Sequence, residues 1–370
     1  MTRCFVFVHA RACRFAARCG AVAALLLLAA GCALPPDIDQ VTRAEGAGTA
    51  RGAIVPDPVP RLAERKFVTA DGTVLPLRVW LPSGPIPGGV KAVILALHGF
   101  DDYSNAFAMP AETWAQYGIA TYAYDQRGFG AAPGRHEWPG RAPLAADAAT
   151  AASLLRRMYP GKPIYLLGES MGAAVAIVAM TGESGTPRPD VDGVILTAPA
   201  VWGWQTMDLL PRLALWAGVR LMPKERFTGS SLHVLASDNI PMLRALGRDP
   251  LVIHETEVDT IYGLVNLMGA ALRSAPLLDV PLLVQYGAHD QIVPPLPVRD
   301  FVAGLPRHPI YPRRLAYYPH GYHMLLRDLD RAETASDIAS WILDRNAPLP
   351  SREDAAENDR PWPPRKAGSG

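Results

Sequence analysis

The chain has 370 residues, of which 49% are hydrophobic and 19% charged, so it can bury a sizeable core in one large or two ordinary domains. Its formal net charge is +1 and the body of the chain carries no basic block, so a nucleic acid is not an expected partner. The four cysteines all lie within the first 32 residues, which leaves the rest of the chain without disulfides or thiolate metal ligands.

The first predicted element is an export signal over residues 1–31. Arginines between Arg3 and Arg18 carry the only charges before Asp37, and the apolar run Gly20–Cys32 follows them. This run is too short to span a bilayer, which needs about 20 apolar residues. A basic start, a short apolar core and small residues at its end are typical of a secretory signal.

The end of this segment, Leu28–Cys32 (LAAGC), resembles the lipobox of a bacterial lipoprotein signal. The resemblance implies that Cys32 becomes the first residue, acylated by fatty acids such as palmitate, and anchors the exported protein to a membrane of the cell envelope. Ala33 after the cysteine implies the outer membrane in a two-membrane bacterium. Ala29 stands where leucine is usual, and an ordinary signal peptide cut nearby is the alternative that the residues leave open.

Residues 32–60 are rich in Pro, Gly and Ala and show no periodicity, which predicts a flexible tether before a folded domain at 61–346. Within Lys66–Leu81, two strand-like runs are joined by Asp71-Gly72, a dipeptide that favours a β-hairpin.

Apolar runs then alternate with helix-like runs. The expected strands are 92–97, 119–124, 164–167 and 193–197, and the expected helices are 104–117, 142–159 and the run after Ser170. Strands that are apolar throughout and alternate with helices indicate a mostly parallel sheet with helices on both faces. The predicted fold class is therefore α/β.

At Ala198 this alternation stops for about 75 residues, which indicates an insertion, about 198–275, with its own structure. Helices are expected at Trp204–Met222 and Val258–Arg273. Apolar residues of the insertion are candidates for contact with an acyl chain: Trp202, Trp204, Met207, Leu264 and Met268. The alternative is that they only pack the insertion onto the body.

The sheet is expected to resume at 281–286 and to end with a strand at 313–318, with helices near 295–304 and 329–345. Residues 347–370 are charged and proline-rich, a composition that predicts a disordered tail.

The strongest local pattern is Gly168–Gly172 (GESMG), a G-x-S-x-G between an expected strand and an expected helix. Glycines permit the tight turn that such a junction needs. The turn would lift the Ser170 hydroxyl clear of the sheet and place it at a helix N-terminus, where free N–H groups favour negative charge. The alternative is a glycine-rich β–α turn with a helix-capping serine.

A nucleophilic serine needs a base, and the base needs a residue that orients it. Sites in parallel sheets form beyond the carboxyl ends of the strands. Asp290 follows the strand 281–286, and His320 and His323 follow the strand 313–318, so both histidines are candidate bases. The chain order Ser, Asp, His is that of α/β-hydrolases. A turn-capping role is the alternative for Asp290.

Over residues 61–346 the chain resembles α/β-hydrolases of the monoacylglycerol lipase and lysophospholipase group. The matching segments, in order, are LALHGF, YDQRGFG, GESMG, GAHDQIVP and HGYHMLLRD. In that family a glycine precedes the catalytic histidine at short spacing, which implies His323 rather than His320. The residue after the nucleophile, Met171, is expected to supply one oxyanion N–H, and the resemblance implies Phe100 as the second donor. The insertion corresponds to the family's cap.

These observations predict a serine hydrolase that cleaves carboxylic esters through an acyl-enzyme, with Ser170, His323 and Asp290 as the triad and no metal or organic cofactor. The resemblance implies monoacylglycerol- or lysophospholipid-like substrates. Prolyl aminopeptidases, thioesterases and acyltransferases with similar sheets are alternatives, as is an envelope lipoprotein that keeps the fold as a binding module. The oligomeric state is not predicted.

Overall fold

The computed structural model describes residues 59–83, 89–229, 234–354 and 362–363. The predicted export signal, Cys32 and the tether up to residue 58 lie outside the described residues, as do 84–88, 230–233 and most of the predicted tail.

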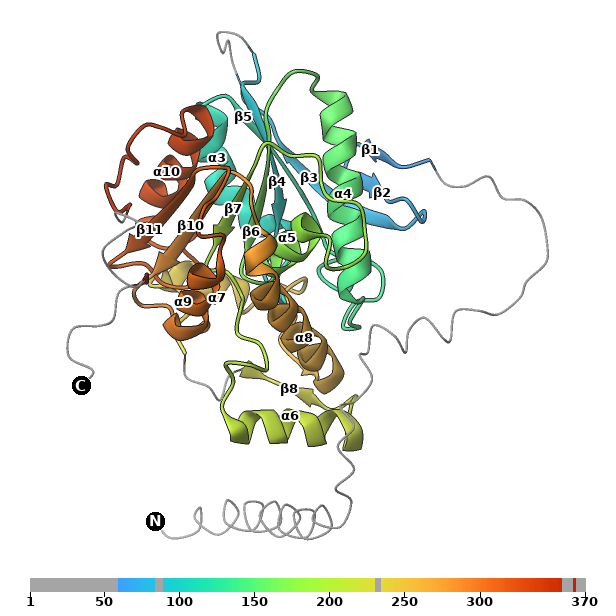
Figure 1. Cartoon of the computed structure of the whole chain (residues 1–370). Helices are drawn as coiled ribbons and strands as arrows, with labels where there is room; N and C mark the ends of the chain where they lie inside the picture. Colours follow the sequence, from blue (N-terminus) through green and yellow to red (C-terminus); the bar gives the residue numbers. More distant parts are fainter. Residues whose placement is uncertain (1–58, 84–88, 230–233, 355–361, 364–370) are drawn as a thin grey trace, which may run out of the picture. The chain divides into compact units, whose positions relative to one another are not determined.

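A nine-stranded sheet forms the centre of the folded domain, in the order β1-β2-β3-β5-β4-β6-β7-β10-β11 (Figure 1). Its strands are β1 (Arg61–Ala63), β2 (Lys66–Val68), β3 (Val74–Trp80), β4 (Ala92–Leu97), β5 (Ile119–Tyr124), β6 (Ile164–Glu169), β7 (Gly193–Thr197), β10 (Leu282–Gly287) and β11 (Arg313–Tyr318). Every pairing from β5 to β11 is parallel, whereas β1, β2 and β3 pair antiparallel. The α/β class and the mostly parallel sheet are thereby confirmed.

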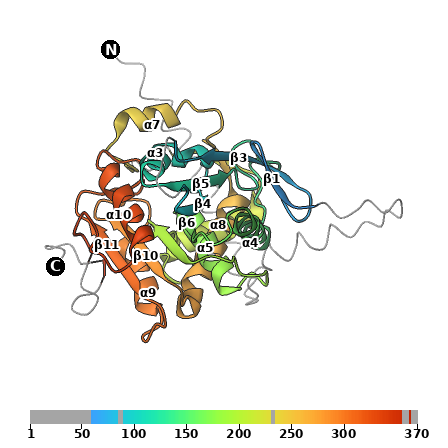
Figure 2. The same cartoon turned by 90° about the horizontal axis from the view of Figure 1, so that it is seen from above.

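Helices cover both faces of the sheet (Figures 1 and 2). On one face α3 (Ala108–Gln116) packs against α10 (Arg331–Leu343), and the indole N–H of Trp114 donates to the carbonyl of Ala335 at 3.0 Å. The other face carries α4 (Arg141–Met158), α5 (Met171–Thr181), α8 (Val258–Ser274) and α9 (Pro295–Gly304). Because neither face meets water, every residue of β4, β5, β6 and β10 is buried, as their apolar composition predicted.

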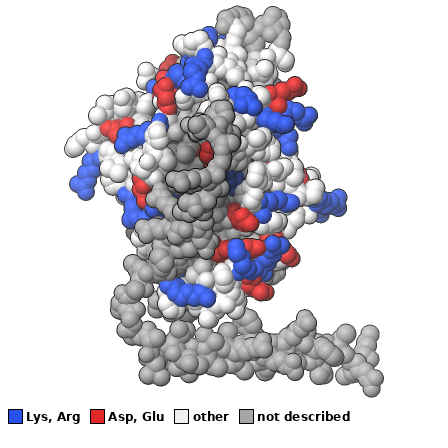
Figure 3. Space-filling view, turned by 90° about the vertical axis from the view of Figure 1, so that its right-hand side faces the viewer, with Lys and Arg blue, Asp and Glu red and all other residues white. Residues whose placement is uncertain are grey.

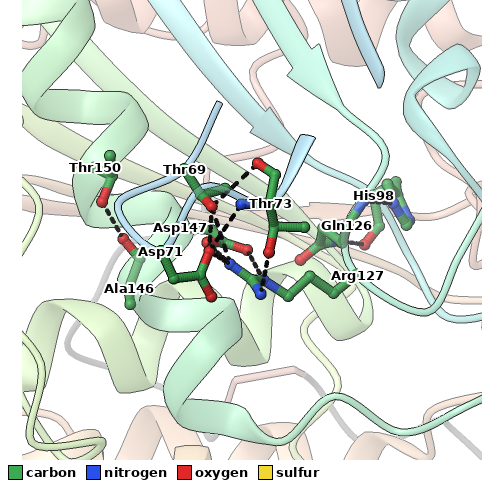
Figure 4. A network of polar contacts seen from close by, with 9 residues as sticks. All are labelled: Thr69, Asp71, Thr73, His98, Gln126, Arg127, Ala146, Asp147 and Thr150. Atoms are coloured by element: carbon green, nitrogen blue, oxygen red, sulfur yellow. Dashed lines mark hydrogen bonds and ion pairs between the residues drawn. The ribbon is translucent and has the colours of Figure 1, made fainter. Parts of the chain in front are cut away.

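The predicted hairpin is present, and Arg127 connects it to the helical layer (Figure 4). Gly72 has φ of 84° in the turn between β2 and β3. The Arg127 guanidinium contacts Asp71 in this turn at 2.8 Å and Asp147 on α4 at 2.7 Å. Arg127 therefore holds the loop after β5 against both neighbours.

The insertion contains α6 (Leu209–Leu221), β8 (Arg226–Phe227), α7 (Ile240–Leu246), β9 (Thr256–Glu257) and α8. Three details differ from the sequence expectation. The first helix begins at Leu209 rather than Trp204, since Trp204–Thr206 form a turn. A two-stranded antiparallel sheet, β8 with β9, lies where no strand was expected. Finally, α8 packs on α5 and α9 of the body and so is a body helix as much as a cap helix.

The disorder expected over 347–370 is wrong for residues 347–354 and 362–363. Leu349 is buried, Asp354 pairs with Ala316 at the outer edge of β11, and its carboxylate contacts Arg314. Trp362 packs edge-to-face on Tyr286 with ring centroids 6.3 Å apart. Composition missed this order because a few buried contacts on a sheet edge suffice to hold a polar segment.

No helix among the described residues is long and apolar enough to cross a membrane. On the face drawn in Figure 3, basic and acidic side chains are interspersed rather than gathered by sign.

Candidate active site

Ser170 occupies a sharp turn between β6 and α5, as the G-x-S-x-G pattern predicted. Its φ of 54° is unusual for a residue with a side chain, and such backbone strain costs about 1–3 kcal/mol. The flanking glycines are required by close approach. A Cβ on Gly172 would lie 2.0 Å from the carbonyl oxygen of Leu97, and one on Gly168 would lie 2.4 Å from the backbone nitrogen of Ala173. The Ser170 hydroxyl is thereby presented at the carboxyl edge of the sheet.

The structure brings together the three side chains expected to form the triad. The Ser170 Oγ lies 2.9 Å from Nε2 of His323, and Nδ1 of His323 lies 2.8 Å from Oδ2 of Asp290. His323 is only 5% exposed. The other histidines near these loops are placed differently, since His320 is exposed and His289 stacks on Tyr322. Of the two candidate bases, the family resemblance implied His323, and only His323 reaches Ser170 in the described structure.

The surroundings of Asp290 determine the protonation of His323. The Asp290 side chain is fully buried, and its Oδ1 accepts hydrogen bonds from the backbone N–H groups of Ile292 and Val293 at 2.8 and 2.9 Å. Three donors in all, these two N–H groups and the His323 ring, converge on this carboxylate. Because a carboxylate only accepts, Nδ1 of His323 carries the proton that it donates to Oδ2, and Nε2 is left to accept the Ser170 O–H.

Burial and charge act in opposite directions on the pKa of His323. Burial lowers this pKa, but the carboxylates of Asp290 and Glu169 raise it, while the cation of Arg327 lowers it. The net result is a pKa above the ordinary value of 6.5 for histidine. His323 is therefore a stronger base than a free imidazole, and it loses this capacity when the solution becomes acidic.

The two expected oxyanion donors belong to the Ser170 turn and to the loop after β4. Met171 is the first residue of α5, where helix N–H groups have no intrahelical acceptor. Phe100 follows β4 in the next loop, and Gly99 in that loop lies close to Ser170, because a Cβ built on it would meet the Ser170 Cβ at 3.4 Å. Within the part of the chain that the structure describes, neither N–H donates to a protein acceptor. Both remain available to a ligand oxygen.

His98 is a structural residue of this loop (Figure 4). It is fully buried, its Nδ1 lies 2.8 Å from the carbonyl oxygen of Gly99, and its Nε2 accepts the Gln126 backbone N–H at 2.9 Å. Since a carbonyl only accepts and an amide N–H only donates, the ring is neutral with its proton on Nδ1. Burial lowers the pKa of His98, which keeps the ring neutral. The two hydrogen bonds of this ring fix the loop that carries Phe100.

Two segments of the insertion touch the loops around Ser170. In the first, Ala236 accepts the backbone N–H of Met324 at 2.9 Å, beside His323. In the second, the Ile253 N–H donates to the carbonyl of Asp101 at 2.8 Å, beside Phe100, and the Thr256 hydroxyl donates to the Asp101 carboxylate at 2.7 Å. The insertion therefore contacts both the loop of His323, called the base loop, and the loop of Phe100, called the oxyanion loop.

The apolar residues proposed for the acyl chain have mixed positions. Met268 is buried, and Trp204 donates to Asn266 at 2.7 Å and packs edge-to-face on Tyr262, so both also serve the packing of α8. Trp202, Met207 and Leu264 are half-buried. A contact of these residues with a substrate stays a prediction.

Sequence reasoning missed a group of buried charges under the site, formed by Asp102, Glu169 and Arg327. The available signal was their position in the sequence, because these three charged residues lie within four residues of Phe100, Ser170 and His323 at the ends of apolar strands and loops. Among the described residues, no group of three or more His, Cys, Asp or Glu side chains could hold a metal ion.

Comparison with known families agrees with this geometry. A family model named Hydrolase_4, described as "Serine aminopeptidase, S33", matches residues 88–330. The chain belongs to this family. The match spans β4 to the loop before α10, and so includes every residue placed in the site above.

Several relatives of this Hydrolase_4 chain are lipases. A monoglyceride lipase of Rattus norvegicus is 26% identical over 299 residues, which cover 79% of this chain and 94% of that protein. A monoacylglycerol lipase of Mycolicibacterium smegmatis is 25% identical, over 76% of this chain and 97% of that protein. The crystal structure of a Paleococcus ferrophilus monoacylglycerol lipase matches with a TM-score of 0.60 at 19% identity, covering 74% of this chain and 99% of that one, which shows the shared fold.

Proposed function

We propose that this chain is a carboxylic ester hydrolase that cleaves monoacylglycerol- or lysophospholipid-like esters through an acyl-enzyme on Ser170. The observation that carries the proposal is the pair of hydrogen bonds that joins Ser170 to His323 at 2.9 Å and His323 to Asp290 at 2.8 Å. The names of the relatives, monoglyceride and monoacylglycerol lipases, support the same class of substrate.

In the first half-reaction, Ser170 Oγ attacks the ester carbonyl carbon while its proton moves to Nε2 of His323. Asp290 keeps the other ring proton on Nδ1 and stabilises the imidazolium that forms. The carbonyl oxygen becomes an oxyanion and accepts the N–H groups of Phe100 and Met171. One such donor is worth about 10²–10³-fold in kcat.

The tetrahedral intermediate then collapses. The bond to the leaving oxygen breaks, the Nε2 proton of His323 passes to that oxygen, and the alcohol leaves. A water molecule repeats the sequence on the acyl-enzyme, with its proton taken by His323 and returned to Ser170, and the carboxylic acid is released. No step needs a metal or an organic cofactor.

The surface of the insertion supports an apolar substrate. None of the 13 residues of α6 is buried, and Leu209, Leu210 and Leu213 are 66%, 78% and 53% exposed. Exposed apolar groups of this extent favour contact with lipid-like molecules. We therefore place the selection of acyl chains with the insertion and the chemistry with the body.

The nucleophile is tested with a fluorophosphonate probe and p-nitrophenyl butyrate. Wild-type protein should be labelled and active, and Ser170→Ala should lose both properties while its circular dichroism stays unchanged. The matched control is Ser153→Ala on α4, whose hydroxyl accepts from Arg157 and which should be labelled like the wild type. Labelling of Ser170→Ala at the wild-type rate would refute the proposal.

The substrate class is tested with esters of graded acyl length. Removal of one CH₂ group from water is worth about 0.8 kcal/mol, so kcat/KM should rise at most roughly fourfold per CH₂ from acetyl to medium or long chains. Monoacylglycerols and lysophospholipids of equal chain length then identify the head group. A preference for acetyl esters would contradict the lipase-like assignment and leave a short-chain esterase.

A second candidate function comes from the description of the family model, a serine aminopeptidase. The same nucleophile could attack an amide next to a free amine. Amino-acid p-nitroanilides, proline included, test this candidate directly. A larger kcat/KM on these amides than on any ester would replace the ester hydrolase by a peptidase.

We further propose that the protein is exported and anchored to the envelope through acylated Cys32, with the outer membrane as its place in a two-membrane bacterium. The basic start and the LAAGC segment support this proposal. Cys32→Ser should release the protein from membranes or block its processing. Membrane association that is unchanged in this variant would argue for an anchor other than lipid on Cys32.

A further inference from the structure

A single buried arginine connects three of the four loops that carry the site, all but the loop of Asp290. The Arg327 side chain is 6% exposed, and it lies four residues after His323. Its Nη1 donates to Asp102 at 2.7 Å and its Nη2 donates to Glu169 at 3.0 Å. Glu169 directly precedes Ser170, and Asp102 is two residues after Phe100. One guanidinium thus spans the base loop, the nucleophile turn and the oxyanion loop.

The link from Arg327 back to His323 is short and well bonded. The Arg327 backbone N–H donates to the carbonyl of Met324 at 2.7 Å, which closes a tight turn directly after His323. The Arg327 carbonyl accepts the Asn239 side-chain amide at 2.9 Å, and Asp328 accepts the Tyr322 N–H at 2.7 Å. A shift of the guanidinium would therefore be transmitted to the imidazole.

Stability alone gives no reason for this arrangement. Burying an ion costs several kcal/mol, and apolar replacements of buried ion pairs are often neutral or stabilising. The arrangement is also incomplete, because Oε1 of Glu169 and Nε of Arg327 are buried without a protein partner among the described residues. A costly and partly unsatisfied group of charges on the loops of Phe100, Ser170 and His323 points to a role in the reaction.

We propose that Arg327 is a positioning residue of the hydrolase. Its two hydrogen bonds, one to Asp102 and one to Glu169, hold His323, Ser170 and the Phe100 N–H in their reactive arrangement. This inference rests on the function proposed above and adds a specific residue to it. Arginine suits the task because its planar guanidinium presents donors in a fixed geometry, which the flexible ammonium of lysine does not.

Charges of this group also act on the His323 imidazole, so their removal should shift the pH dependence of the reaction. A purely packing role of Arg327 would not produce such a shift. Besides its own burial, His323 experiences the carboxylates of Asp290 and Glu169, which raise its pKa, and the cation of Arg327, which lowers it. Loss of the Glu169 charge should therefore move the acid limb of the kcat/KM profile to lower pH. Loss of the Arg327 charge should move that limb to higher pH.

The experiment measures kcat, KM and pH profiles on p-nitrophenyl butyrate, together with the rate of fluorophosphonate labelling. Misplacement of reacting groups by 1 Å can cost ~10²-fold, so Arg327→Met should lose about that factor in kcat with KM nearly unchanged. Arg327→Lys should lose less kcat and keep the acid limb at the wild-type pH. Glu169→Gln should shift the acid limb downward.

The matched control is Arg345→Met, which removes a half-buried arginine whose hydrogen-bond partners, Tyr165 and Asp192, lie away from the site loops. It should lower the melting temperature and leave kcat unchanged. The proposal is overturned if folded Arg327→Met keeps wild-type kcat, or, should that variant not fold, if Arg327→Lys keeps wild-type kcat and Glu169→Gln keeps the wild-type acid limb. A wild-type protein that the probe does not label would instead remove the proposed function itself.

Discussion

The loops at the carboxyl edge of the sheet and the helix α6 of the insertion are built in opposite ways. His323 is 5% exposed and the Asp290 side chain is fully buried, and each has defined hydrogen-bond partners. In α6 no residue is buried, and Leu210 is 78% exposed. The site loops hold a few polar side chains in defined positions by burial and hydrogen bonds. Helix α6 presents exposed apolar side chains that no surrounding packing holds in position.

This difference shows which part of the molecule tolerates change. Burial and hydrogen bonding leave the site loops few alternative arrangements, so substitutions there should affect both folding and chemistry. The side chains of α6 contribute little to the core, so substitutions there should leave stability unchanged. The contacts of Ala236 and Ile253 with the site loops form the boundary between the two regions.

The largest effect is expected for the base. His323→Ala should lower kcat by ~10³-fold or more, because removal of one triad member leaves only oxyanion stabilisation and binding. His320→Ala is the control, since this exposed histidine does not reach Ser170 in the described structure. Steady-state kinetics on a short ester measure both variants. An equal loss in the two would show that the geometry does not identify the base.

Core and surface leucines sharpen the comparison in terms of stability. Leu166 in β6 is fully buried, so Leu166→Ala should lower the free energy of unfolding by about 2–5 kcal/mol. Leu210→Ala on α6 should change it by less than about 0.5 kcal/mol. Urea denaturation followed by circular dichroism measures both values. A similar loss for Leu210→Ala would mean that α6 packs against something in solution.

Two glycines test the strictness of the nucleophile turn. Gly172→Ala would place a Cβ 2.0 Å from the carbonyl oxygen of Leu97, so it should cost about 1–3 kcal/mol and displace Ser170. Gly247→Ala, after α7 in the insertion, meets no atom closer than 3.5 Å at a φ of −64° and should be neutral or slightly stabilising. Melting temperatures and fluorophosphonate labelling compare the two. A fully labelled Gly172→Ala protein would contradict the clash.

A pH-dependent effect is expected at the boundary, where Asp101 accepts from Thr256. Burial raises the pKa of Asp101 to about 7, although the Thr256 hydrogen bond opposes this. The folded state then binds a proton that the unfolded state, with a pKa near 3.8, releases, so stability falls as the pH rises from about 4 to 7. Asp101→Asn lacks this loss of stability. The difference in melting temperature between Asp101→Asn and the wild type should therefore be more in favour of the variant at pH 8 than at pH 5. An equal difference at both pH values would contradict the shifted pKa.

Much of the fold followed from local patterns. Six-residue apolar runs such as Ala92–Leu97 predicted buried parallel strands because only such strands exclude polar residues on both faces. The insertion was less predictable, since its short strands β8 and β9 have two residues each and no period to detect. The order at 347–354 escaped detection because it depends on contacts with β11 rather than on composition.

By itself, the amino-acid sequence determined the α/β class and the position of Ser170 between a strand and a helix, and it predicted Asp290 as the acid, because these depend on neighbours within a few residues. Only the tertiary structure showed that His323, 153 positions from Ser170, lies at hydrogen-bond distance while His320 does not. It alone also assembled Arg327, Glu169 and Asp102 beneath the site. The physical reason is that these ion pairs and proton-transfer contacts form at the carboxyl edge of the sheet, where loops distant in sequence converge. No local sequence pattern shows which side chains of these loops meet.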